Sequence, residues 1–183
     1  MNIRRLTYIA VTVTLTVVCS WISIPFAVPF TLQTFAVFCT LLVLGGKDGL
    51  LSILLYILLG AVGLPVFSGF RGGIAHLMGP TGGYIWGFAA TAAIYWLFER
   101  NVKGALPMRR AIFALALGLI ACYAFGTAWF AAVYRARGTA YGVGSVLLLC
   151  VVPYIVPDLC KLFLAMQVGK RITRILHREK DAQ

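Results

Sequence analysis

The stretch LTYIAVTVTLTVVCSWISIPFAVPFTLQTFAVFCTLLVLGG, residues 6–46, contains no Asp, Glu, Lys or Arg. A charge near the centre of a bilayer costs about 3 kcal/mol or more, so charges collect at the ends of membrane-spanning helices. A helix needs only about 20 residues to cross, which makes this run too long for one span. Pro25 and Pro29 interrupt it, and proline breaks a helix interior. The run therefore predicts two spans, Leu6–Ile24 and Gln33–Leu44.

Four more apolar segments follow along the chain: Gly49–Leu64, Tyr84–Phe98, Ala111–Tyr134 and Tyr141–Met166. Of the 183 residues, 61% are hydrophobic and 11% are charged, whereas a soluble domain has about 25% charged residues. Six spans with short loops use the whole length and leave no room for a second domain. We expect an all-α integral membrane protein with six transmembrane helices, forming a single domain over residues 1–183.

The 16 Lys and Arg residues indicate how these spans are oriented. Lys161 lies inside the last span, and three others fall in loops on one side of the membrane: Arg71, Arg135 and Arg137. The remainder fall on the opposite side, which the positive-inside rule identifies as cytoplasmic. Both termini are therefore predicted to be cytoplasmic, with external loops at 25–32, 65–83 and 135–140. Apolar tracts separate the basic residues, which is unlike the patch of a nucleic-acid-binding protein.

The chain has few residues that could perform catalysis. It has five acids, and only Asp158 lies at membrane depth, whereas acid–base or metal chemistry there would want at least two converging carboxylates. The five cysteines lie singly in apolar segments, without CxxC or Cys/His spacing, and no GxxxxGK[ST] loop is present to bind ATP. We expect no enzyme, no metal site and no cofactor, so active transport would need energy from another subunit.

Asp158 and Lys161 form the most informative pair in the sequence, just after Pro153 and Pro157. Their i, i+3 spacing puts both side chains on one helix face. Two ionisable groups at this depth should face a cavity and pair with each other or with a ligand. One interpretation is a structural salt bridge that locks a proline-kinked helix. The other is recognition of a small polar ligand, for which a cyclic urea or amide is suited, because Asp accepts from its N–H and Lys donates to its C=O.

The segment VPFTLQT, residues 28–34, connects the first two spans. Its mixed apolar and polar character favours an ordered loop tucked into the protein, where Thr31 and Gln33 would need hydrogen-bond partners. A simple helix-breaking connector is the alternative.

The segment between the third and fourth spans is rich in glycine. Its glycines could present backbone amides to a ligand, or serve close helix packing, as Gly83 and Gly87 could on the fourth span. Arg71 could meet the anionic end of a ligand, or it could be a solvated loop charge.

Four strings resemble a known family: VPFTLQTFAVF at 28–38, LLYILLGAVGLPVFSGF at 54–70, GPTGGYIWGF at 79–88 and VPDLCKLFLA at 156–165. Together, and in this order along most of the chain, they resemble the BioY family. That family is the biotin-binding S component of energy-coupling-factor (ECF) transporters. The resemblance implies a six-helix, S-component-like bundle in the prokaryotic cytoplasmic (inner) membrane, surrounded by membrane lipid. It also implies capture of biotin from outside and transfer across the membrane with a transmembrane T component and ATPase subunits.

The resemblance also implies roles for particular residues. Asp158 and Lys161 match the acid and lysine that hydrogen-bond the ureido ring, and the loop at 28–34 matches a lid over the pocket. Arg71 and Tyr84 are candidates for the ligand's carboxylate, and Thr31 and Gln33 for contacts from the lid. Two alternatives remain: an S component for another vitamin, and a structural membrane subunit in which Asp158 and Lys161 form a buried bridge.

Overall fold

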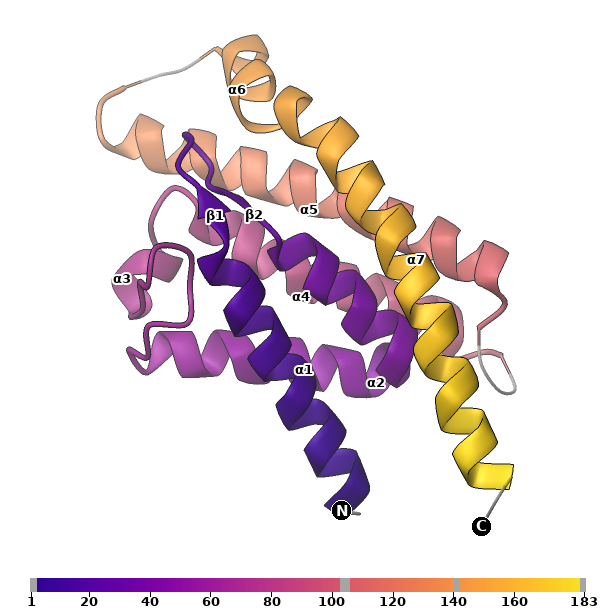
Figure 1. Cartoon of the computed structure of the whole chain (residues 1–183). Helices are drawn as coiled ribbons and strands as arrows, with labels where there is room; N and C mark the ends of the chain where they lie inside the picture. Colours follow the sequence, from indigo (N-terminus) through magenta and orange to yellow (C-terminus); the bar gives the residue numbers. More distant parts are fainter. Residues whose placement is uncertain (1–2, 103–105, 140–141, 182–183) are drawn as a thin grey trace.

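The computed structural model describes residues 3–102, 106–139 and 142–181, and helices dominate it (Figure 1). In chain order the elements are α1 (Ile3–Trp21), β1 (Ser23–Ile24), β2 (Phe30–Thr31), α2 (Gln33–Ala61), α3 (Ile74–Leu77), α4 (Gly82–Glu99), α5 (Met108–Ala136), α6 (Val143–Cys150) and α7 (Val152–Asp181). Four helical stretches in the described part are long and apolar enough to cross a membrane: Ile3–Trp21, Gln33–Ala61, Met108–Ala136 and Gly144–Ile172. The chain is therefore an all-helical membrane protein.

The long helix α2 bends at Gly45, which has φ 78° and ψ 178°. Its two arms run in different directions on either side of this point (Figure 1). A Cβ atom at Gly46 would lie 2.4 Å from the Cα of Trp96 on α4, and the Gly46 N–H donates to the Glu99 carboxylate. The angles at Gly45 are not helical, so two helical arms meet at this bend within α2. The bend lies between the segments predicted as the second and third spans and confirms that division of the sequence.

Glycines bring α4 and α5 close together. A Cβ at Gly87 would lie 2.9 Å from the Cα of Cys122, and a Cβ at Gly118 would lie 3.0 Å from the Cα of Thr91. Thr91 Oγ1 also donates to the carbonyl of Gly118 at 2.9 Å. Gly83 packs in the same way against Trp129, which confirms the predicted close-packing role of Gly83 and Gly87.

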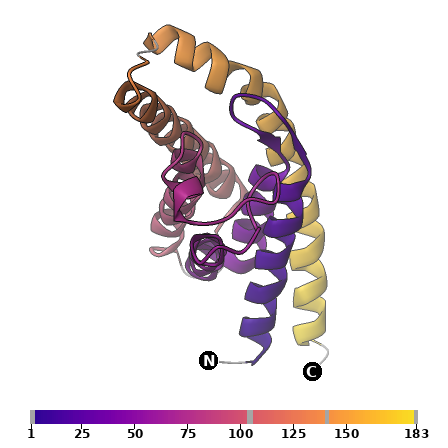
Figure 2. The same ribbon diagram turned by 90° about the vertical axis from the view of Figure 1, so that its left-hand side faces the viewer.

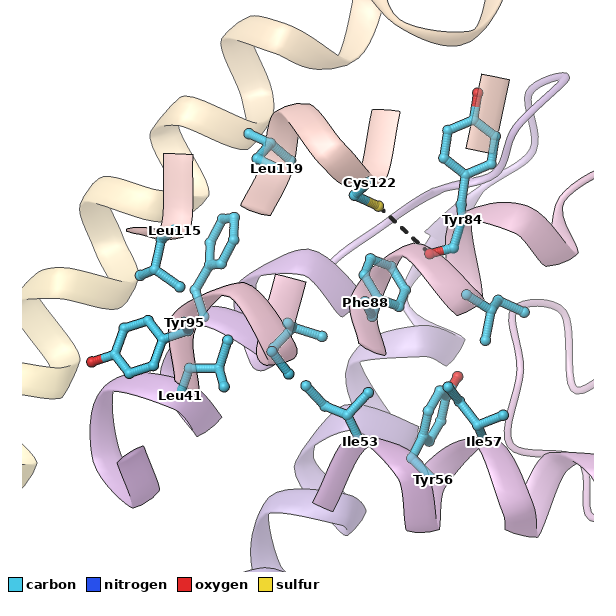
Figure 3. Close-up of a cluster of buried hydrophobic side chains, with 14 of the residues drawn as sticks. Leu41, Ile53, Tyr56, Ile57, Tyr84, Phe88, Tyr95, Leu115, Leu119 and Cys122 are labelled. Carbon is cyan, nitrogen blue, oxygen red and sulfur yellow. Dashed lines mark hydrogen bonds between the residues drawn. The ribbon is translucent and has the colours of Figure 1, made fainter. Parts of the chain in front are cut away.

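Buried apolar side chains of α2, α4 and α5 meet in the core of the bundle (Figure 3). Figure 3 shows Ile53 and Tyr56 of α2, Phe88 of α4 and Leu119 of α5 directed toward this shared interior. Packing of this kind fixes the relative positions of the three helices, because protein interiors leave little free volume.

Two features of local structure were not predicted from the sequence. The loop after the first span contains a small hairpin, in which Ser23 pairs with Thr31 and Ile24 with Phe30; strands of two residues are too short to show an alternating pattern. The sixth predicted span, Tyr141–Met166, is broken at Val151, with φ −125° and ψ −56°. Pro153 follows this break and lacks the N–H that a continuous helix would use. Tyr141 itself lies outside the described residues.

Different structural elements lie at the two ends of the bundle (Figure 1). The hairpin, α3 and the end of α5 lie toward one end. The N-terminus, the C-terminus and the bend in α2 lie toward the other. This separation places the loops predicted to be external together.

Candidate ligand-binding site

Asp158 and Lys161 lie on one face of α7 and are almost fully buried, at 4% and 5% exposure. Lys161 Nζ donates to Asp158 Oδ1 at 2.7 Å. Both charges therefore have a partner within one helix turn, as the i, i+3 spacing predicts. Pro157 is accommodated inside α7 immediately before the aspartate.

Tyr123 on α5 holds the second oxygen of the same carboxylate. Its hydroxyl donates to Asp158 Oδ2 at 2.6 Å, a short distance typical of a hydrogen bond to an ionised acceptor. Tyr123 could not be identified from the sequence, because a tyrosine in an apolar span has no local signal for its partner on another helix. The carboxylate is thus oriented by two elements, α5 and α7.

Side chains of α7 contact the β1–β2 hairpin, and the ribbons of the two elements lie on the same side of the bundle in Figure 2. Lys161 Nζ lies 4.1 Å from the centroid of the Phe30 ring, a distance at which cation and ring attract each other. Tyr154 of α7 donates its hydroxyl to the carbonyl of Val28. The loop at 28–34 is therefore ordered and tucked into the protein, as predicted.

A cavity opens between the hairpin, α4, α5 and α7 and reaches the ion pair. The centre of a water molecule can occupy about 70 Å³ of it, which is room for several waters. Ile85, Phe88 and Leu119 give it apolar walls. Its polar lining includes Thr31, Gln33, Ser68, His76, Thr81, Tyr123, Asp158 and Lys161. Apolar walls with a few convergent polar groups are typical of a small-molecule site.

Thr31 and Gln33 line the cavity and also hold its edge together. Gln33 Nε2 donates to the hydroxyl of Tyr56 at 2.7 Å, and that hydroxyl donates to the carbonyl of Val66 at 3.1 Å. The Gln33 N–H donates to Thr31 Oγ1 at 3.2 Å. Both predicted residues therefore find the polar partners that a buried position requires.

Tyr84 and Arg71 differ in their relation to the cavity. Tyr84 lines it, while the Tyr84 hydroxyl lies 3.1 Å from Thr127 Oγ1 and its backbone carbonyl faces Cys122 Sγ (Figure 3). Arg71 is exposed, pairs through its backbone with Phe67, and is not among the residues that line the cavity. Five of the six residues singled out from the sequence thus surround one cavity, and Arg71 lies outside it.

His76 is a second cavity residue that the sequence pattern did not mark as a binding group. Its ring stacks on Phe67, with centroids 5.4 Å apart. Burial, and secondarily the positive charge of Arg71, hold the pKa of His76 below its usual value. The ring is therefore neutral at physiological pH, with one nitrogen able to donate and the other to accept.

Metal-ligating side chains do not gather in the described part of the chain, where no group of three or more His, Cys, Asp or Glu residues is placed to hold an ion. The five cysteines are free thiols, four of them buried. The chemistry of the site therefore rests on the ion pair, the hydroxyls, the amide and the imidazole.

The chain is similar to known proteins over nearly its whole length. The model of the BioY family matches residues 1–178. A probable biotin transporter BioY of Pyrococcus horikoshii is 39% identical over 173 residues, covering 94% of this chain and 98% of the relative. The biotin transporter BioY of Thermotoga maritima is 38% identical over 173 residues, covering 94% and 97%. Both relatives are named as transporters, in agreement with the expectation that the chain is not an enzyme.

Among solved structures, the S component for biotin from an ECF-type ABC transporter has the same fold, with a TM-score of 0.80. The match covers 94% of this chain and 92% of that one at 24% identity. The fold, the family match over nearly the whole sequence and the two relatives agree with one another, and the chain belongs to the BioY family.

Proposed function

We propose that this protein is the biotin-binding S component of an ECF transporter, which captures biotin from outside the cell. The observation that carries the proposal is the buried Asp158–Lys161 pair, which lines a cavity within the helical bundle. Ionisable groups are retained at such depth mainly where they serve a ligand or transport path. The family membership identifies biotin as the ligand to test first.

The pair keeps unused hydrogen-bonding capacity that suits the ureido ring of biotin. Each oxygen of Asp158 accepts one bond, from Lys161 or Tyr123, and each has a second lone pair for a ligand N–H. The ammonium group of Lys161 has three donors, so it can donate to the ureido carbonyl while it holds Asp158. Ile85, Phe88 and Leu119 offer apolar contact to the thiophane ring and the valeryl chain.

The second polar end of biotin is a carboxylate, which we place toward the loop side of the cavity. Tyr84 is the candidate there that lines the cavity. Arg71 lies outside the cavity wall, so its contact with the carboxylate would require a change in the loop that carries it. Thr31 and Gln33 line the cavity, and we propose them as contacts from the hairpin side.

We further propose six spans in a prokaryotic cytoplasmic membrane, formed by α1, the two arms of α2, α4, α5 and the α6–α7 segment. The basic residues favour cytoplasmic termini and an external hairpin. The sequence has no P-loop for ATP, so transport would depend on a T component and ATPase subunits. Ala10 and Thr14 are exposed on α1, where small side chains would permit close docking of a partner helix.

A structural role for the pair is the second candidate, because Asp158 and Lys161 already satisfy each other. The two candidates differ in what an apolar replacement does. Asp158→Leu combined with Lys161→Met would leave a purely structural subunit folded and functional. A binding protein with this double change would stay folded and lose its ligand.

The test is a binding experiment on the purified chain alone. Thermal shift with biotin, thiamin and riboflavin comes first, since only a ligand of the folded state raises the melting temperature. Isothermal titration calorimetry then measures the stoichiometry. We expect a shift and saturable binding with biotin only. A shift with another vitamin instead would assign a different substrate, and no shift with any of them would favour the structural role.

A further inference from the structure

A second hollow lies on the bundle, between α5 on one side and α6 and α7 on the other. Its volume is about 730 Å³. The lining is apolar apart from Tyr123 and Thr127, and side chains such as Ile120 and Leu159 are 63% and 52% exposed there. We call this hollow the lateral groove. The groove lies among helices long and apolar enough to cross a membrane. In the bilayer it would therefore be exposed to lipid acyl chains.

The groove shares a wall with the ligand cavity. Leu119 and Tyr123 line both of them, so the residue that orients Asp158 also lines the groove. Whatever fills the groove therefore packs against Tyr123.

Arg135 on α5 is a cationic residue near one end of the groove. Ala124, Ala128 and Ala131 line the groove on α5. Arg135 follows Ala131 by four residues, so it lies one turn further along the same helix face. Arg135 is exposed. An apolar trough that ends at a positive charge matches an amphiphile with an anionic head.

We propose that the lateral groove binds one acyl chain of an anionic phospholipid, with the phosphate at Arg135, and that this chain supports Tyr123 from the membrane side. The apolar lining suits the chain, and the guanidinium group suits a phosphate, with which it can form two parallel hydrogen bonds. A zwitterionic phospholipid would also bind in the groove, but its headgroup would gain less binding energy from Arg135.

Native mass spectrometry of the purified full chain tests this proposal by measuring the bound phospholipid. The protein is first exchanged into detergent that contains equal amounts of phosphatidylglycerol and phosphatidylcholine with the same acyl chains. The wild type should retain phospholipid, with phosphatidylglycerol favoured roughly five-fold, the usual effect of one basic side chain at an anionic surface. Ala128→Phe, which fills the groove, should lower the total bound lipid several-fold. Arg135→Gln should abolish the headgroup preference and leave the total bound lipid nearly unchanged.

Two matched controls lie on the same helix. Ala132 is exposed on α5 and does not line the groove. Arg109 is exposed at the opposite end of the same helix. Ala132→Phe and Arg109→Gln should therefore both retain lipid as the wild type does. Lipid retention by Ala128→Phe equal to that of the wild type would overturn the assignment of the groove. An unchanged preference for phosphatidylglycerol in Arg135→Gln would overturn the headgroup site, whatever the other variant does.

Discussion

Asp158 has each carboxylate oxygen held by a different residue. Lys161 bonds Oδ1 and Tyr123 bonds Oδ2, while Phe30 lies against the ammonium group of Lys161. The spacing of Asp158 and Lys161 could be read from the sequence, because it follows from helix geometry. Tyr123 and Phe30 could not, because their contacts depend on how α5 and the hairpin pack against α7.

Tyr123→Phe removes one hydrogen bond to the site and keeps the ring. A hydrogen bond to an ionised group contributes about 1.5–3 kcal/mol, so biotin affinity should fall by roughly ten- to a hundred-fold. Tyr8→Phe on α1, outside the cavity lining, is the control and should leave the affinity unchanged. Calorimetry measures both. If Tyr123→Phe bound biotin as tightly as the wild type, Tyr123 would not be orienting the binding carboxylate.

His76 gives the folded state a pH dependence with a definite sign. Its pKa in the folded protein lies below the usual value, whereas the unfolded chain has a pKa of about 6.5. Between these values the unfolded state holds more protons, so stability falls as the pH drops below about 6.5. His76→Gln should flatten the fall in melting temperature between about pH 7.5 and 5.5. Equal slopes for the variant and the wild type would refute the role of His76.

At the scale of helices and strands, some boundaries could be predicted from the sequence, and others depend on contacts across the bundle. The charges near residues 47 and 48 correctly divided the long apolar run after Gln33, because charged side chains avoid the membrane centre. The break at Val151 was missed, since Pro153 can either start a helix or kink one. The two-residue strands of the hairpin are too short to carry a pattern in the sequence. They pair with each other, and Phe30 contacts Lys161 and Tyr154 of α7.

Close packing of α4 on α5 predicts a large difference between two glycines. A Cβ at Gly87 would lie 2.6 Å from Cys122 Sγ, whereas a Cβ at Gly144 would meet no atom within 4 Å. Gly87→Ala should therefore destabilise the protein by about 1–3 kcal/mol through overpacking. Gly144→Ala should be neutral or slightly stabilising, because alanine favours a helix. Melting temperatures in the same detergent compare them, and an equal effect of the two changes would contradict the packing account.

For the whole molecule, the distribution of basic residues predicts which end faces outward. In a variant whose native cysteines are replaced, Thr139→Cys should react with a membrane-impermeant maleimide added to intact cells. Asn101→Cys should react only after the cells are lysed. Both positions are exposed, so accessibility within the protein does not distinguish them. The reverse pattern of labelling would show that the predicted topology is inverted and that the ligand enters from the other side.

The most direct test of the account is calorimetric titration of biotin into purified wild type, Asp158→Asn and Asp48→Asn. Asp48 is the matched control, because it pairs with Arg5 and does not line the cavity. Removing one partner of a buried charge pair costs about 2–5 kcal/mol, so Asp158→Asn should weaken biotin binding by roughly thirty-fold or more. Asp48→Asn should bind as the wild type does. Unchanged affinity in folded Asp158→Asn would contradict the assignment of the site.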